Sequence, residues 1–125
     1  MTAEAIFPVT REGGVHVVVA PEEIDITNAA VLRAALLEAS SGCRSVVVDM
    51  SGTYFCDSAG LNVLVRAHDR ATSDGGQLGL VMDGADVRRI FVITGIDRVI
   101  PIFPSRADAL TGLAAAVPEP PPPGL

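Results

Sequence analysis

Hydrophobic residues along the chain form two kinds of pattern, short unbroken runs and segments with helical spacing. The unbroken runs are rich in Val and Ile and have the length of buried strands. They predict strands at about residues 5–11, 15–20, 45–49, 77–82 and 99–103. Between the later runs, apolar residues recur three and four positions apart, as on one face of a helix. The helical stripes are Val31, Leu32, Ala35, Leu36 and Ala39; Leu61, Leu64, Val65 and Ala71; Val87, Ile90 and Phe91; and Leu110, Leu113 and Ala114.

Turn and cap residues separate these segments. Glu12-Gly13-Gly14 is typical of a hairpin that joins the first two strands. Thr27 is predicted to cap the first helix and Gly42 to end it. Residues 105–108 have the spacing of a capping box, which predicts that Ser105 begins the last helix.

The alternation of strands with helices decides the fold class. Strands that alternate with helices pair in parallel, because each connection must cross back to the same end of the sheet. We therefore expect residues 1–117 to form one α/β domain. Its mixed, mostly parallel sheet has about five strands with an N-terminal antiparallel hairpin, and about four helices lie mainly on one face of it.

The composition changes beyond Val117. Residues 118–125 contain five prolines, and such a run stays extended and solvated instead of joining a core. We expect a disordered tail that acts as a spacer, although a proline-rich segment can also dock into an aromatic groove.

Charge and residue usage exclude several classes of function. The net charge of −6 argues against binding along a nucleic-acid backbone. The nine basic residues are all Arg, so a P-loop lysine and a Schiff-base lysine are both excluded. Two cysteines and two histidines without metal-ligand spacing predict no metal site, and we expect no cofactor. No signal peptide and no apolar run of about 18 residues is present, which predicts a cytoplasmic protein without a membrane span.

The most informative segment is the Ser58 corner, defined here as residues 55–61. It follows the buried strand at 45–49 and opens the second helix, so Ser58 lies close to a helix N-terminus. The first backbone N–H groups of a helix lack internal partners, and the helix dipole favours negative charge there. A hydroxyl at this point is either a plain N-cap or a position that tolerates a phosphate.

Two familiar kinds of site fit this corner poorly. A serine hydrolase elbow has glycine two residues before the serine, where this chain has Cys56, and it needs a distant histidine. His68 follows Ser58 by only ten residues in the same helix, where we expect it to be a packing residue. A receiver domain with Asp49 as phosphoacceptor also needs a lysine, which the chain lacks. Asp49 is therefore expected to cap a loop or to orient the corner.

Four segments together resemble the motifs of anti-sigma factor antagonists, the bacterial STAS domains. They are residues 23–29, 46–50, 55–61 and 94–96. The resemblance runs from about Ile6 to Leu113. Its Asp-Ser-x-Gly-Leu block after an aliphatic strand is fairly specific, and the Glu-x-Asp block upstream at this distance strengthens it.

The resemblance implies a non-enzymatic partner-switching protein. Such an antagonist binds an anti-sigma factor that is itself a serine kinase, and so releases a sigma factor. The kinase phosphorylates the serine that matches Ser58, which ends the binding, and a metal-dependent PP2C-type serine phosphatase restores it. Asp25, Asp57, Ser58 and Gly60 are the implied partner-binding residues, in a monomer or weak dimer. The alternative is a scaffold or transport-complex subunit with the same fold and no phosphorylation.

Two positions depart from the family pattern, and two residues have simpler interpretations. Glu22 stands where the family often has glycine, and Ala59 where many relatives have a second hydroxyl. Ser58 is therefore the only hydroxyl residue in its block. The simpler interpretations are that Ser58 is only an N-cap and that Asp25 is a loop residue that caps the first helix. The two cysteines, Cys43 and Cys56, are expected to be structural thiols.

Overall fold

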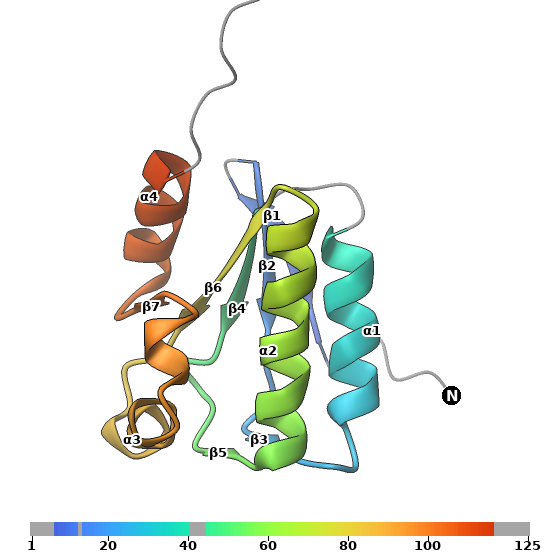
Figure 1. Cartoon of the computed structure of the whole chain (residues 1–125), viewed down its shortest axis with the longest axis vertical. Coiled ribbons are helices and arrows are strands. Elements are labelled where there is room, and N and C mark those ends of the chain that lie inside the picture. The colour runs from blue at the N-terminus through green and yellow to red at the C-terminus, as the bar shows by residue number, and fades with distance from the viewer. Residues whose placement is uncertain (1–6, 13, 41–44, 117–125) are drawn as a thin grey trace, which may run out of the picture.

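The structure, a computed structural model, describes residues 7–12, 14–40 and 45–116. Within these ranges a five-stranded sheet has the order β1-β2-β4-β6-β7 (Figure 1). The strands are β1 (Val9–Glu12), β2 (Val15–Val19), β4 (Ser45–Asp49), β6 (Gln77–Val81) and β7 (Ile102–Phe103). β1 and β2 pair antiparallel, and all other neighbours pair parallel. The predicted mixed sheet with an N-terminal hairpin is confirmed.

Some sequence predictions fall outside the described ranges. They concern residues 5–6 of the first strand, Gly13, Gly42, Cys43 and the tail at 118–125. Inside the ranges, the hairpin turn is confirmed, because Gly14 adopts a left-handed φ of +81° between β1 and β2.

The last strand is shorter than predicted. Only Ile102 and Phe103 pair with β6, although the sequence indicated a strand from residue 99. The amides of Val99 and Ile100 instead donate to the carbonyl of Ile96. These bonds close a short 3₁₀ helix, η2 (Ile96–Arg98), so the two amides are not available for the sheet.

The described residues form four α-helices, as the stripes predicted. They are α1 (Ala29–Ser40), α2 (Ser58–Ser73), α3 (Ala85–Ile93) and α4 (Arg106–Ala116). In Figure 1, α1 and α2 lie side by side along the sheet, and they share one core cluster with α3. α4 packs on the opposite face of the sheet, against Val17 and Val47. The expectation that the helices lie mainly on one face therefore fails for α4.

The pattern of β4 explains how helices cover both faces. All five of its residues are buried. Successive side chains point to opposite faces, so Val46 and Val48 join the core under α1 and α2, while Val47 joins the core under α4. An unbroken Val run is typical of a parallel strand that is covered on both sides.

An ion pair fixes the start of α4 to the end of β4. Arg106 donates two hydrogen bonds to one carboxylate oxygen of Asp49, at 3.1 and 2.7 Å, and a third to Glu12 at 2.9 Å. The backbone N–H of Ser51 also donates to Asp49, at 3.0 Å. Burial raises the pKa of Asp49, but the hydrogen bonds from Ser51 and Arg106 outweigh it and hold this pKa below its ordinary value. The expectation that Asp49 caps a loop is confirmed.

Candidate functional site

A second, two-stranded sheet builds the candidate site. β3 (Glu23–Ile24) and β5 (Phe55–Cys56) pair in parallel, with Ile24 opposite Cys56. The N–H of Asp57 then donates to the carbonyl of Ile24 at 3.0 Å, so Asp25 and Asp57 leave the ladder at the same point. The sequence did not predict these strands. Their pairing brings together two segments that the resemblance had named separately.

Asp57, and not Ser58, is the N-cap of α2. Its backbone is extended, and its carboxylate accepts a hydrogen bond from the N–H of Gly60 at 3.1 Å. The carbonyl of Asp57 accepts the N–H of Leu61, which is the first bond of the helix. The interpretation of Ser58 as a plain N-cap is therefore wrong.

Ser58 is the first residue of α2, and its side chain is exposed. Within the ranges that the structure describes, its hydroxyl makes no hydrogen bond. The hydroxyl thus stands at the positive end of a 16-residue helix without a structural task. Both features suit a group that is modified by another protein.

Gly60 is buried beneath the surface that carries Ser58. A Cβ atom at Gly60 would lie 2.6 Å from Cγ2 of Ile24 and 2.7 Å from Sγ of Cys56. Only glycine therefore lets the first turn of α2 lie directly on β3 and β5. Because Gly60 is buried, it does not contact a partner directly. It can influence binding only by fixing the position of α2.

The thiol that Gly60 approaches is part of the core. Cys56 is 2 % exposed, and burial raises the pKa of its thiol to about 12, with a smaller contribution from the charge of Asp57. The thiol stays protonated at neutral pH and is a poor nucleophile. This agrees with the expectation of a structural cysteine.

Asp25 shapes the loop that precedes α1. Its carboxylate accepts hydrogen bonds from the hydroxyl and the backbone N–H of Thr27, and these bonds lower the pKa of Asp25. Its own N–H donates to the side chain of Asn28 at 3.0 Å, and Asn28 donates back to the carbonyl of Glu23 at 2.8 Å. The carbonyl of Asn28 accepts the first bond of the helix, from Leu32, so the predicted cap at Thr27 is one residue too early. Asp25 has a structural role here, and its contact with a partner stays a prediction.

Exposed apolar side chains stand close to the two aspartates along the chain. Ile26 is 78 % exposed, Tyr54 61 % and Phe55 42 %, and we call these three residues the apolar rim. The neighbouring Glu23, chiefly through hydrogen bonding, raises the pKa of the Tyr54 hydroxyl. Apolar groups beside charges are typical of protein interfaces. Sequence reasoning missed the apolar rim, although hydrophobic residues in segments without a strand or helix stripe were a usable signal.

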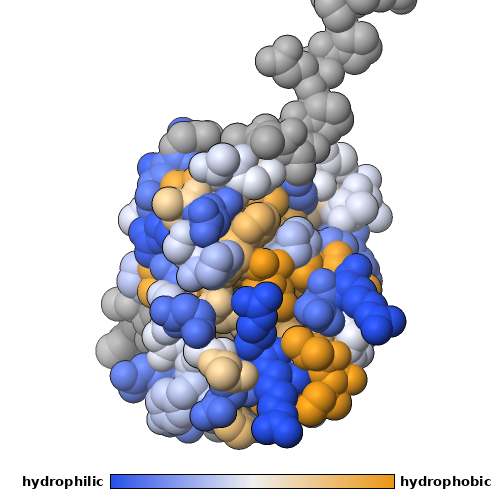
Figure 2. All heavy atoms as spheres, turned by 90° about the vertical axis from the view of Figure 1, so that its left-hand side faces the viewer, coloured by the Kyte–Doolittle hydropathy of each residue, from blue (hydrophilic) through white to orange (hydrophobic). Residues whose placement is uncertain are grey.

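The fourth resemblance segment, residues 94–96, ends α3. Gly95 adopts a left-handed φ of +79°, which closes the helix and starts η2. Val92, Ile93 and Val99 are exposed around this turn. Figure 2 shows the face with α3 and α4, where hydrophobic side chains stand among charged ones. α3 lies at the same end of the molecule as β3 and β5 (Figure 1).

The distance between Ser58 and His68 excludes that pair as a catalytic dyad. Ten residues of α2 separate them, which corresponds to about 15 Å along the helix axis. A nucleophile and its base must lie within about 3 Å. The side chain of His68 is only 16 % exposed and lies within the fold, in agreement with a packing residue.

Substitutions of Asp57 should separate its capping role from its charge. Asp57→Ala is expected to lower the stability by about 1 kcal/mol, because it removes the N-cap of α2. Asp57→Asn should cost much less, since Asn caps helices about as well as Asp. Thermal unfolding of both variants checks this. Equal losses of stability for Ala and Asn would contradict a capping role and would point to the charge.

Comparison with known proteins agrees with this geometry. Residues 7–109 match the family model of the STAS domain. The anti-sigma-F factor antagonist RsfB of Mycobacterium tuberculosis is 31 % identical over 106 residues, which cover 84 % of this chain and 86 % of that protein. A crystal structure of an anti-sigma factor antagonist from Mycobacterium paratuberculosis has a TM-score of 0.80 at 30 % identity, and the match covers 86 % of this chain and 92 % of that one. The phosphorylated form of Bacillus SpoIIAA has a TM-score of 0.65 at 16 % identity, over 85 % and 97 % of the two chains, and shows likeness of fold alone.

Proposed function

Because the chain belongs to the STAS domain family, we propose that it is an anti-sigma factor antagonist switched by phosphorylation at Ser58. In its unphosphorylated form it binds a kinase-type anti-sigma factor, and a sigma factor is released. Two relatives with this kind of function, about 30 % identical over most of both chains, support the assignment. The observation that carries it is the exposed, unbonded Ser58 hydroxyl at the start of α2.

The chemical step belongs to the partner, not to this chain. The anti-sigma kinase transfers the terminal phosphoryl group of ATP to the Ser58 oxygen, which loses its proton, and ADP leaves. A PP2C-type serine phosphatase with its own metal ions then hydrolyses the phosphate ester and restores the hydroxyl. This chain acts as a binding protein without catalytic residues, in the cytoplasm, and does not contact nucleic acid.

The local electrostatics let the fold tolerate this phosphate. A phosphoserine adds about −1.5 to −2 charges and three acceptor oxygens. The dipole of α2 favours a negative charge at its start by about 0.3–1 kcal/mol. Asp57, the adjacent cap, opposes it by repulsion of similar size. The two effects nearly cancel, so phosphorylation should change the free energy of unfolding very little.

The same phosphate acts strongly on a complex. Ser58 stands beside Asp25, Asp57 and the apolar rim, which we propose as the contact surface for the anti-sigma factor. Burying an unpaired dianion in an interface costs several kcal/mol. Each 1.4 kcal/mol lowers the affinity tenfold. Phosphorylation therefore separates the partners without unfolding the antagonist.

A scaffold or transport-complex subunit is the rival function. Such a subunit needs no accessible hydroxyl at the start of α2, whereas the structure leaves Ser58 exposed. No helix in the described part of the chain is long and apolar enough to cross a membrane.

Incubation with ATP and the kinase-type anti-sigma factor tests the proposal. Mass spectrometry should find one added phosphate, located on Ser58, and none in Ser58→Ala. Ser73→Ala is the matched control, because Ser73 is an exposed serine at the other end of α2. It should accept the phosphate like the unchanged protein. Absence of phosphate, or phosphate at another residue, contradicts the switch.

A further inference from the structure

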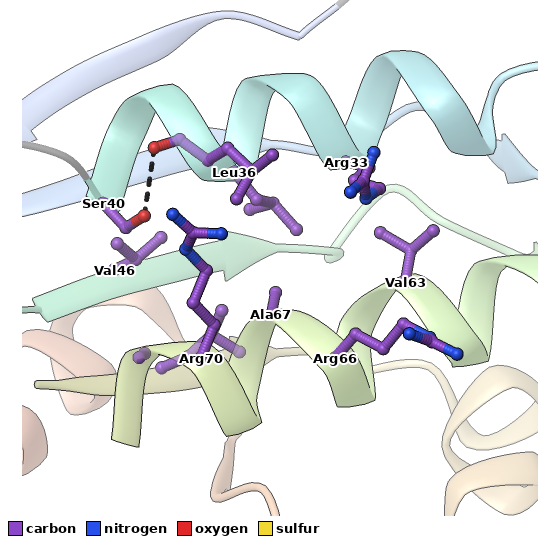
Figure 3. Close-up of a pocket in the computed structure, with 11 residues that line it drawn as sticks. Arg33, Leu36, Ser40, Val46, Val63, Arg66, Ala67 and Arg70 are labelled. Carbon is purple, nitrogen blue, oxygen red and sulfur yellow. Dashed lines mark hydrogen bonds between the residues drawn. The ribbon is translucent and has the colours of Figure 1, made fainter. Parts of the chain in front are cut away.

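A groove between α1 and α2 lies apart from the candidate site. It encloses a cavity of about 210 Å³ over the sheet face that these helices cover. Apolar side chains form its floor: Leu36, Val46, Val63, Ala67 and Leu78. Figure 3 shows Leu36 from α1 and Val63 and Ala67 from α2 on either side of the gap. The floor residues come from two helices and two strands, α1, α2, β4 and β6, and all of them except Ala67 are almost fully buried.

Three arginines stand at this groove. Arg33 comes from α1, and Arg66 and Arg70 come from α2, one helical turn apart. In Figure 3, Arg70 extends from α2 toward Leu36 and Ser40 of α1, whereas Arg33 lies on α1 opposite Val63, further along the same gap. Nine basic residues serve the whole chain, so a third of them gather at one cavity.

No carboxylate in the described part of the chain pairs with these arginines. Nε of Arg66 donates to the amide oxygen of Asn62 at 3.3 Å, which is a neutral partner. Among the residues that the structure describes, Arg33 and Arg70 form no hydrogen bond or ion pair. Arg106, by contrast, binds two carboxylates. The chain has a net charge of −6, so it contains more than enough acidic residues to pair with its arginines. A shortage of acidic residues therefore does not explain the unpaired arginines at this groove.

The arrangement gathers like charges at one groove. Arg66 and Arg70 are four residues apart on one helix, where like charges repel each other, and Arg33 adds a third charge from the facing helix. A guanidinium group has its donors in a fixed fork that matches a carboxylate or a phosphate. Small-molecule sites combine an apolar lining with a few convergent polar groups. The groove has an apolar lining and arginines from both helices at its edge.

We propose that this groove binds a small organic anion, with its acidic head at Arg33 and Arg70 and a short apolar body on the floor between α1 and α2. The volume of about 210 Å³ is below the roughly 300–1,000 Å³ of pockets for drug-sized ligands, which limits the apolar body to a short one. This site goes beyond the proposed switch and does not depend on it. Arg70 lies about 18 Å along the axis of α2 from Ser58.

Titration of the full chain with hexanoate tests the site by ¹H–¹⁵N NMR. Hexanoate should shift the amide signals of Arg33, Ala67 and Arg70 in a saturable way. Acetate, which lacks the apolar body, and hexanol, which lacks the charge, should each bind at least about tenfold more weakly. Equal binding of acetate and hexanoate would show that the floor takes no part, and would overturn the proposal.

Variants locate the binding within the groove. Arg33→Gln and Arg70→Gln should each weaken hexanoate binding by about tenfold or more. Ala67→Leu keeps all three charges but fills the groove, and should abolish binding. Arg88→Gln, an exposed arginine of α3 outside the groove, is the control and should bind like the unchanged protein. An equal loss in the Arg88 variant would indicate unspecific attraction and contradict the site.

A further experiment distinguishes two kinds of anion that could bind here, a lipid head group at a membrane surface and a free small anion. Vesicles of phosphatidylglycerol present an anionic head at a lipid surface, whereas hexyl phosphate is a free phosphate ester. Saturable binding of hexanoate or hexyl phosphate supports the proposal. Binding to vesicles alone, without any of the free anions, would assign the arginines to a membrane surface and overturn it.

Discussion

Ser58→Asp is expected to weaken binding to the kinase-type anti-sigma factor by roughly 10- to 100-fold, with little change in the melting temperature. The new carboxylate stands next to Asp57 and places unpaired negative charge in the proposed contact surface. A loss of about 1.4–2.8 kcal/mol corresponds to this range. Phosphorylation carries more charge than Asp, so it should weaken binding further.

Ser58→Ala is the informative partner of this variant. The cap of α2 is Asp57, so the Ser58 hydroxyl contributes no capping bond and its removal should hardly change stability. The variant should bind the anti-sigma factor like the unphosphorylated protein, and should keep binding when ATP is added. Calorimetric titrations of both variants, with melting curves alongside, provide the measurement. If Ser58→Asp binds like the unchanged chain, Ser58 does not lie in the contact surface and the switch is rejected.

Gly60→Ala is expected to lower the free energy of unfolding by roughly 1–3 kcal/mol, the usual cost of overpacking a core. The added methyl group would lie 2.6 Å from Ile24 and 2.7 Å from Cys56, too close for either neighbour to stay in place. α2 must then move away from β3 and β5, which displaces Ser58 and Asp57. We therefore expect weaker binding to the anti-sigma factor as well as lower stability.

Gly52→Ala is the matched control for this prediction. A Cβ atom at Gly52 meets no atom within 4 Å, and its φ is not in the left-handed region. The substitution should be neutral or slightly stabilising, because it reduces the freedom of the unfolded chain. Denaturant titrations of both variants compare the two glycines. Similar stability of Gly60→Ala and Gly52→Ala would contradict the close packing under Ser58.

The sequence by itself determined the elements with a clear period. β4 was evident from its Val run, and α2 from apolar residues spaced by three and four positions. The hairpin turn followed from its glycines, because few other residues adopt a positive φ. The position of Ser58 between a strand and a helix followed from the same local patterns. Each of these signals lies within a short stretch of chain, which is why sequence alone could show them.

The boundaries near the site were less predictable. Ser58 and Asp57 are both good capping residues, and only the geometry of the corner assigned the cap to Asp57. The same holds for Thr27 and Asn28 at the start of α1. Neighbouring residues of similar chemistry compete for one role, and the path of the backbone decides between them.

Only the tertiary structure decided which distant segments meet. β3 and β5 have two residues each, too few to show a period, and their pairing depends on hydrogen bonds between residues about 32 positions apart. This pairing unites Asp25, Asp57 and the apolar rim on one surface. In the same way, Arg33 lines one groove with Arg66 and Arg70 only because α1 and α2 lie side by side. α4 covers the second face of the sheet, where Val47 belongs to the apolar cluster under it. Local periodicity records which face of an element is apolar, but contacts between elements depend on how the whole chain buries those faces at once.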